Sequence, residues 1–225
     1  MQEFNPVKFY SFLKIQERLE MVKNKIIPDS WYIPELDLYK TYAWEITYLK
    51  RQEAIMFLGF SLIAKNWIIP LSKWIGNRKC LEIMSGQGSL SYALEQEGVS
   101  IITTDNFSWM GSGNLWKNKE GFLWKDVENI DAISAIQKYG DSIDIIICSW
   151  PPKDDNIFAK CILEMRKLNP NCLMIFIGEG YGGCTTNDLF FETAEFIEDQ
   201  DFENCFNEGK YCQWFDIHDY PRLCK

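Results

Sequence analysis

Short apolar runs alternate along the chain with segments whose apolar residues recur every three or four positions. Four short runs predict strands, at 80–84, 99–103, 143–148 and 172–177. Three periodic segments predict helices, at 89–97, 132–139 and 155–168. Because strand and helix alternate, we expect an α/β fold with a doubly wound, mainly parallel sheet and helices on both of its faces.

The region before the first strand predicts an N-terminal helical cap. Residues 7–25 have helical periodicity, a second helix is expected from Arg51 to Asn66, and Pro70 is followed by a short helical turn. We therefore expect two parts, a helical cap over 1–75 and a sheet domain over 76–225.

Residues 29–50 are crowded with aromatic side chains, namely Trp31, Tyr32, Tyr39, Tyr42, Trp44 and Tyr48. Such density is typical of a segment that packs onto a neighbouring surface. The alternative interpretation is a lid, in which Tyr42 and Trp44 close over a bound ligand.

Two stretches give weaker signals. A short strand is predicted near 124–127, before Asp131 and the helix that follows it. From Phe202 onward we expect two short strands, joined at 207–210 as a hairpin at the edge of the sheet.

Composition limits the class of partner. The chain has 225 residues, 47% of them hydrophobic, and a formal net charge of −9, with a pI of about 4.8. This charge disfavours attraction to nucleic acid and to anionic lipid. The most apolar run, 54–64, is too short to span a bilayer, and the N-terminus lacks the basic and apolar blocks of a signal peptide. We expect a small molecule or a protein as the substrate.

The cysteines predict a reduced, cytoplasmic protein. Three of the eight, Cys80, Cys148 and Cys172, fall inside predicted central strands. No CxxC pair occurs and His218 is the only histidine, so we expect neither a zinc site nor a disulfide framework.

A glycine turn follows the first predicted strand. Gly86 and Gly88 can take positive φ and leave room for a ligand beside the backbone, while the helix that begins near Ser89 points free N–H groups at that space. Asp105 ends the next strand, 17 residues after Gly88, where a carboxylate can accept both hydroxyls of a ribose. Together these residues predict a nucleotide site, although Asp105 alone could equally be a helix cap.

Three further segments carry candidate chemistry. Residues 150–152, Trp-Pro-Pro, predict either a rigid turn or a wall beside a bound cation. The loop 178–185 holds four glycines and is either a flexible surface loop or a substrate cover. His218 and Asp219 form either a surface pair or a general base oriented by a carboxylate.

With these residues in place, the chain resembles the class I methyltransferases that use S-adenosylmethionine (SAM), whose fold is Rossmann-like. Residues 82–88 are similar to the first motif of that fold, Asp105 to its ribose-binding acid, and Asp131 with Ala132 to its adenine-side motif. The resemblance extends to a poorly characterised group of SAM-dependent methyltransferase-like proteins through Tyr42-Ala43-Trp44, residues 148–152, residues 178–185, Trp214, and His218-Asp219.

The resemblance implies roles for individual residues. The methionine end of SAM is assigned to Glu82, Ser85, Gly86 and Gly88. Asp105 is assigned to the ribose, Asp131 and Ala132 to the adenine, and Tyr42 and Trp44 to a cover over the cofactor. Ser149 is placed at the cofactor and the acceptor, whose other contacts are Trp150, Glu179 and His218, with Asp219 orienting His218.

Three departures from the family pattern shape the expected function. Met84 stands where many relatives have the first glycine, which is tolerable if Met84 is still in the strand. Ser91 takes the third position of a dinucleotide fingerprint, which disfavours a nicotinamide cofactor. Trp150 and Lys153 flank the two prolines, which disfavours methyl transfer to a planar nitrogen. We expect a SAM-dependent methyltransferase; the alternatives are a SAM-binding or interaction module without turnover and an NAD(P)-dependent oxidoreductase.

Overall fold

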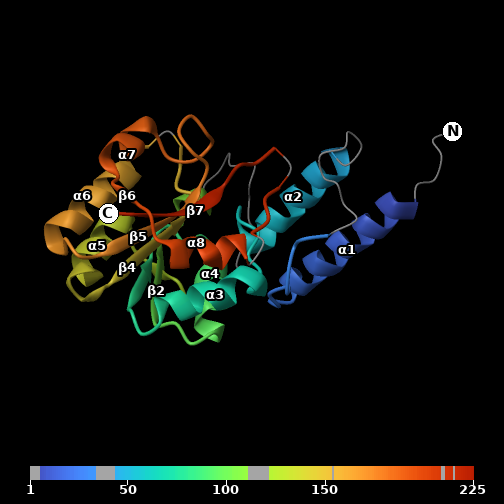
Figure 1. The fold of residues 1–225 in the computed structure, drawn as a ribbon, viewed down its shortest axis with the longest axis horizontal. Coiled ribbons are helices and arrows are strands. Elements are labelled where there is room, and N and C mark those ends of the chain that lie inside the picture. Colours follow the sequence, from blue (N-terminus) through green and yellow to red (C-terminus); the bar gives the residue numbers. More distant parts are fainter. Residues whose placement is uncertain (1–5, 34–43, 111–121, 154, 209–210, 215) are drawn as a thin grey trace.

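The computed structural model describes residues 6–33, 44–110, 122–153, 155–208, 211–214 and 216–225. Helices come first, in the order α1 (Pro6–Lys23), α2 (Trp44–Leu58) and α3 (Lys65–Ile75). In Figure 1, α1 and α2 lie together as a pair at the end of the molecule farthest from α5 and α6. None of the helices in the described ranges is long and apolar enough to cross a membrane.

A sheet forms the centre of the molecule (Figure 1). It has seven strands in the order β3-β2-β1-β4-β5-β7-β6. Its strands are β1 (Cys80–Glu82), β2 (Ile101–Asp105), β3 (Glu128–Asn129), β4 (Ile145–Ser149), β5 (Leu173–Gly178), β6 (Phe196–Ile197) and β7 (Tyr220–Cys224). The first five strands are parallel, whereas β7 runs antiparallel to both β5 and β6. The order reverses between β1 and β4, which is where a doubly wound sheet binds ligands.

The helices that follow β1 cover both faces of this sheet: α4 (Ser89–Gln96), η1 (Ser108–Met110), α5 (Ala132–Tyr139), η2 (Gly140–Ser142), α6 (Ile157–Leu168), α7 (Asp188–Thr193) and α8 (Gln200–Asn207). Side chains of β4 alternate between two cores. Ile145 and Ile147 pack with α1 to α4 and α8, whereas Ile146 and Cys148 pack with α5, α6 and α7. The predicted doubly wound, mainly parallel α/β fold is confirmed, and burial on both faces explains the continuous apolar run.

The apolar run at 54–64 does not form one helix, so the predicted helix from Arg51 to Asn66 is wrong. α2 ends at Leu58, Gly59 takes a φ of 92°, and residues 59–64 cross to α3. Periodicity does not reveal this break, because a buried apolar connection and a buried helix show the same composition. The crossing matters for the site, since it carries Phe60 and Ser61 to the cavity described below.

The predicted C-terminal hairpin is also wrong. Residues 200–207 form α8, whose buried Phe202, Cys205 and Phe206 recur at helical spacing, and Asp199 caps it by accepting a hydrogen bond from Phe202 N at 2.9 Å. The edge of the sheet is formed instead by β6, before α8, and β7, after it.

Two smaller predictions are displaced. The weak strand expected near 124–127 lies at Glu128–Asn129, and Pro70 stands inside α3 rather than before a helical turn. Pro70 removes one backbone hydrogen bond, yet the helix persists because Trp67, Leu71 and Ile75 are buried in the core.

Candidate functional site

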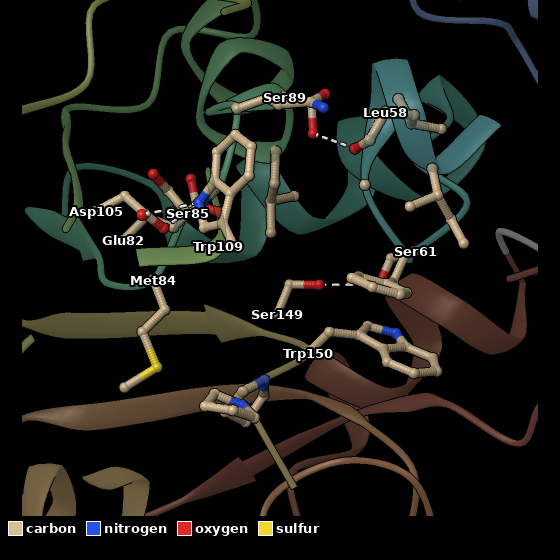
Figure 2. Close-up of a pocket in the computed structure, with 18 of the residues that line it drawn as sticks. Leu58, Ser61, Glu82, Met84, Ser85, Ser89, Asp105, Trp109, Ser149 and Trp150 are labelled. Atoms are coloured by element: carbon tan, nitrogen blue, oxygen red, sulfur yellow. Dashed lines mark hydrogen bonds between the residues drawn. The ribbon is translucent and has the colours of Figure 1, made fainter. Parts of the chain in front are cut away.

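A cavity of about 860 Å³ opens where β1, β2 and β4 end. It is lined by one face of α2, by the 59–63 crossing, by the glycine turn, by the end of β2, by the start of α5 and by the segment after β4. Figure 2 shows Glu82, Ser85 and Asp105 on one side, Ser61 and Trp150 on the other, and Ser149 between them. The cavity has the volume of a small-molecule site and lies at the switch point of the sheet.

The glycine turn has the predicted conformation. Gly86 and Gly88 take φ values of 58° and 73°, and Gly88 directly precedes α4. A Cβ at Gly86 would meet open space, whereas one at Gly88 would lie 3.0 Å from a methyl carbon of Val127. Gly86 therefore leaves room for a ligand beside the backbone, and Gly88 is required by packing. Ser85 Oγ is buried beside this turn without a hydrogen-bond partner in the described residues.

Glu82 is buried beneath the turn. Its carboxylate accepts hydrogen bonds from Ser91 N at 3.1 Å and from Ser91 Oγ. Burial raises the pKa of Glu82 to about 7, and the two hydrogen bonds from Ser91 oppose this rise only in part. Ser91 thus replaces the third glycine of a dinucleotide fingerprint with a side chain that ties α4 to β1.

Asp105, at the end of β2, accepts hydrogen bonds from Gly86 N at 2.7 Å, from Phe107 N at 2.6 Å and from Trp109 Nε1 at 3.0 Å (Figure 2). Burial raises the pKa of the Asp105 carboxyl group, and the three hydrogen bonds, which lower it, offset this rise only in part. A carboxylate offers about four acceptor positions, so two ribose hydroxyls would have to displace the Trp109 indole.

Asp131 lines the cavity and also caps α5. Its carboxylate accepts from Ser134 N at 3.0 Å and from Ser134 Oγ at 2.6 Å, and these bonds lower its pKa. Ala132 lines the cavity beside it. Asp131 is therefore both the cap of α5 and a residue that lines the cavity.

Met84 is not in the strand, contrary to the condition set by the sequence. β1 ends at Glu82, and Met84 takes a φ of 53°, in the left-handed region that favours glycine. The residue that replaces the family's first glycine thus keeps a glycine-like backbone, and its side chain lines the cavity.

The wall after β4 is held by side-chain contacts. Trp150 takes a φ of 58°, stacks on Phe60 with ring centroids 5.0 Å apart, and donates from Nε1 to Asp219 Oδ2 at 3.1 Å. Ser149 Oγ lies 2.8 Å from Ser61 Oγ (Figure 2). Pro151 and Pro152 continue this wall.

His218 and Asp219 are not paired. The carboxylate of Asp219 is buried and receives hydrogen bonds from Trp150 Nε1, from Tyr211 OH at 2.8 Å and from Ser61 Oγ at 3.4 Å. The His218 side chain is exposed and does not line the cavity. Burial raises the pKa of Asp219, and the three hydrogen bonds oppose this rise.

Glu179 also lies outside the lining of the cavity. It accepts from Cys184 N at 2.6 Å and from His218 N at 2.9 Å. Burial raises the pKa of Glu179, but these two backbone donors, the Cys184 side chain and the charge of His218 together outweigh burial and leave the pKa lowered. Glu179 therefore links the loop 180–184 to the backbone of residue 218 through hydrogen bonds.

Tyr42 and the side chain of Trp44 lie outside the described residues, so the predicted cover over the cavity is not described. Sequence reasoning missed Arg51, Phe60 and Ser61, which line the cavity from α2 and the crossing after it. Of these three residues, only Arg51 had a signal in the sequence, because it is a charged residue just before the apolar run 54–64. Within the described ranges, no three histidine, cysteine, aspartate or glutamate side chains gather as metal ligands do.

Comparison with known proteins gives no family model and no curated protein that matches. Solved structures that resemble the chain include human N-acetylserotonin methyltransferase in complex with SAM, at 12% identity and a TM-score of 0.45, over 96% of this chain and 69% of that one. Magnesium protoporphyrin IX methyltransferase from Synechocystis PCC 6803 with bound SAM matches at 11% identity and a TM-score of 0.37, over 100% and 98% of the two chains. A solved methyltransferase-like structure from Anaeromyxobacter dehalogenans matches at 13% identity and a TM-score of 0.35, over 63% of this chain. This chain spans only 55% of the length of that protein. At these identities and TM-scores, the resemblance does not establish an activity of this chain.

Proposed function

We propose that this chain binds SAM in the cavity and catalyses transfer of its methyl group to an acceptor held beside Ser149 and Trp150. One observation carries the proposal. The glycine turn, Asp105 and residues 149–152 lie at the carboxyl ends of three different strands, yet all line one cavity at the switch point of the sheet.

The cofactor half of the cavity suits SAM in shape and charge. Gly86 leaves open space for a ligand, and the buried Ser85 Oγ lacks a partner in the described residues. Asp105 and Asp131 supply negative charge for a ligand with two cationic groups. Glu82 and residues 85–88 would hold the methionine end, Asp105 the ribose, and Asp131 with Ala132 the adenine.

SAM supplies an electrophilic methyl group on a sulfonium. The chain's task is to place a nucleophile in line with that group and to exclude water. Trp150 would form the wall that positions the acceptor, and Asp219 is a positioning residue that holds the Trp150 indole.

A hydrogen-bonded chain leads from the cavity to a buried carboxylate. Ser149 can donate to Ser61, and Ser61 donates to Asp219. We assign to this chain the removal of a proton from a neutral acceptor: Ser149 Oγ takes the proton while passing its own to Ser61, and Ser61 passes its proton to Asp219. A buried carboxylate with a raised pKa is a stronger base than an exposed one. His218 has no part in this assignment.

Cofactor binding is tested by thermal unfolding with S-adenosylhomocysteine, SAM and NAD. We expect the first two to raise the melting temperature and NAD to leave it unchanged, because only a ligand that prefers the folded state stabilises it. Asp105→Ala should weaken binding by about 1–3 kcal/mol, and Asp105→Asn, which preserves shape, by less. Equal stabilisation by NAD would contradict the proposal.

Turnover is tested by release of labelled methyl from SAM with cell extract as the source of acceptor. Ser61→Ala and Ser149→Ala should each slow transfer by about 10²- to 10⁴-fold without weakening cofactor binding. His218→Asn serves as the control and should retain activity. SAM binding with no transfer to any component of the extract would favour the second candidate, a SAM-binding module, which the lack of a paired histidine base keeps open.

A further inference from the structure

Arg51 gives the acceptor half of the cavity a distinct charge. Among the described residues that line the cavity, it is the only lysine or arginine. Ile55 and Leu58 follow it at helical spacing and line the cavity as well, so one face of α2 carries all three. In Figure 2, the acids Glu82 and Asp105 lie on the side of the cavity opposite Leu58 of α2.

The Arg51 side chain is half-buried. Its Nε atom is buried and lacks a hydrogen-bond partner in the described part of the chain. Its central carbon lies 5.8 Å from the ring centroid of Trp150. Burial lowers the Arg51 pKa, but a guanidinium stays charged in proteins. Arg51 is thus a half-buried cation that lines the cavity, and a charge partly withdrawn from water is costly unless a partner satisfies it.

The nearest carboxylates are engaged with other donors. Asp219 and Glu179 attract Arg51 through their charge, yet Asp219 accepts from Trp150, Tyr211 and Ser61, and Glu179 accepts from two backbone N–H groups. Neither forms an ion pair with the guanidinium. These two acids stabilise the charge of Arg51 without accepting hydrogen bonds from its guanidinium, so a ligand in the cavity can accept them.

The surfaces beside Arg51 are flat and apolar. Phe60 and Trp150 stack with an interplanar angle of 17°, and Pro151 continues the same wall. A guanidinium next to such a wall matches a planar molecule with a carboxylate at one end, because the carboxylate can accept two parallel hydrogen bonds. A phosphate dianion fits less well, since Arg51 is a single cation and Asp155 also lines the cavity.

We propose that Arg51 forms a carboxylate subsite and that the methyl acceptor is a flat, apolar molecule bearing a carboxylate. Naming this molecule as the acceptor rests on the proposed function, whereas the subsite is testable without SAM. The carboxylate would anchor the acceptor at α2 and direct its other end toward Ser149.

The test is a titration of the full chain with matched pairs of probes, benzoate against benzamide and phenylacetate against phenylacetamide, with and without S-adenosylhomocysteine. Each carboxylate should bind about 10- to 100-fold more tightly than its amide. Arg51→Gln should abolish that preference and Arg51→Lys should retain part of it. Lys65→Gln, which removes a charge from an exposed ion pair outside the cavity, should leave it unchanged.

Several outcomes would overturn the subsite: equal binding of carboxylate and amide, no binding of any carboxylate at millimolar concentration, or a preference for phenyl phosphate. Loss of S-adenosylhomocysteine binding in Arg51→Gln, with unchanged binding of methylthioadenosine, would reassign Arg51 to the cofactor's own carboxylate. Carboxylate binding by a wild-type chain that binds no S-adenosylhomocysteine would preserve the subsite and reject the proposed function. Circular dichroism of Arg51→Gln and Arg51→Lys establishes that both variants fold.

Discussion

Single residues with unusual backbone conformations lie at or beside the cavity: Met84 and Trp150 line it, and Phe107 stands between the lining residues Asn106 and Ser108. Met84, Phe107 and Trp150 take φ values of 53°, 54° and 58°, and each lies within two residues of the end of a parallel strand, β1, β2 and β4 respectively. A non-glycine residue in this region costs on the order of 1–3 kcal/mol, so the surrounding structure must hold it there. Strain gathered at one edge of the sheet is typical of a functional site.

Glu82 predicts a dependence of stability on pH. Its folded pKa of about 7 exceeds the ordinary value of 4.5, so between these two pH values the native state holds a proton that the unfolded chain has lost. The contribution of Glu82 to the free energy of unfolding therefore falls as pH rises through this window, by at most ~3 kcal/mol.

Urea unfolding of Glu82→Gln beside the wild type tests this sign. The amide oxygen of the variant side chain can still accept from Ser91, but the amide does not ionise. The stability of the variant relative to the wild type should rise from pH 4.5 to pH 7 and then level off. A difference that stays constant with pH would show that Glu82 does not titrate in this range.

Gly88 and Gly98 flank α4 and form a matched pair. Both take positive φ, 73° and 86°, but a Cβ at Gly88 would meet Val127, Lys125 and Thr103, whereas one at Gly98 meets nothing within 4 Å. Gly98→Ala should cost about 1–2 kcal/mol for the backbone alone. Gly88→Ala should cost roughly 1–3 kcal/mol more because of overpacking. Equal losses in urea unfolding would contradict this packing argument.

Among the elements, the N-terminal helices share a core with the sheet domain. Leu19 of α1, Leu58 of α2 and Leu71 of α3 belong to the same buried cluster as Ile145 and Ile147 of β4. The division at residue 75 remains a prediction about the chain, but these helices have no separate core in the described residues. α2 also supplies Arg51, Ile55 and Leu58 to the cavity, so the site depends on it.

Trp31 tests this shared core. It is 7% exposed, donates from Nε1 to Ile63 O at 2.9 Å, and packs on Trp214 with ring centroids 6.1 Å apart. Trp31→Ala should lower the free energy of unfolding by about 3–5 kcal/mol. Tyr32→Ala, at the neighbouring side chain, which is 48% exposed, should lower it by clearly less. Similar losses in the two variants would mean that the segment after α1 is peripheral.

For the protein as a whole, the eight cysteines give a measure of packing. None of them forms a disulfide in the described residues, and only Cys184 is exposed, with Cys212 partly so. Burial raises the pKa of the Cys80, Cys161, Cys172 and Cys224 thiols to about 12, which slows their reaction. In the native protein a thiol reagent should modify Cys184 first, and all eight thiols only after unfolding. Fast modification of more than two thiols before unfolding would contradict the structure.

Local signals predicted much of the central sheet and part of the site. The helix expected at 132–139 is α5, and Asp105 ends β2 as expected, because period, capping and glycine position are properties of neighbouring residues. The C-terminal elements were mistaken for a hairpin, because β6 and β7 pair across α8 and neither strand has a local partner. The pairing of His218 with Asp219 is not found for a similar reason: the Asp219 carboxylate bonds to Trp150 and Ser61, which lie far away in the chain, while the His218 side chain is exposed.

The sequence by itself determined the alternation of strand and helix, the burial of the central strands, the glycine turn and the acid that follows it, since each depends on intrinsic backbone preference or on hydrophobic periodicity. Only the tertiary structure decided that the Asp219 carboxylate is linked to the cavity through the hydroxyls of Ser61 and Ser149. It also decided that Asp219 holds the Trp150 indole and that Arg51 lines the cavity. These properties arise from contacts between residues far apart in the chain, such as Ser61 with Ser149 and Trp150 with Asp219. Burial then sets their energies, because a charge or hydrogen bond removed from water is governed by the groups that replace the water.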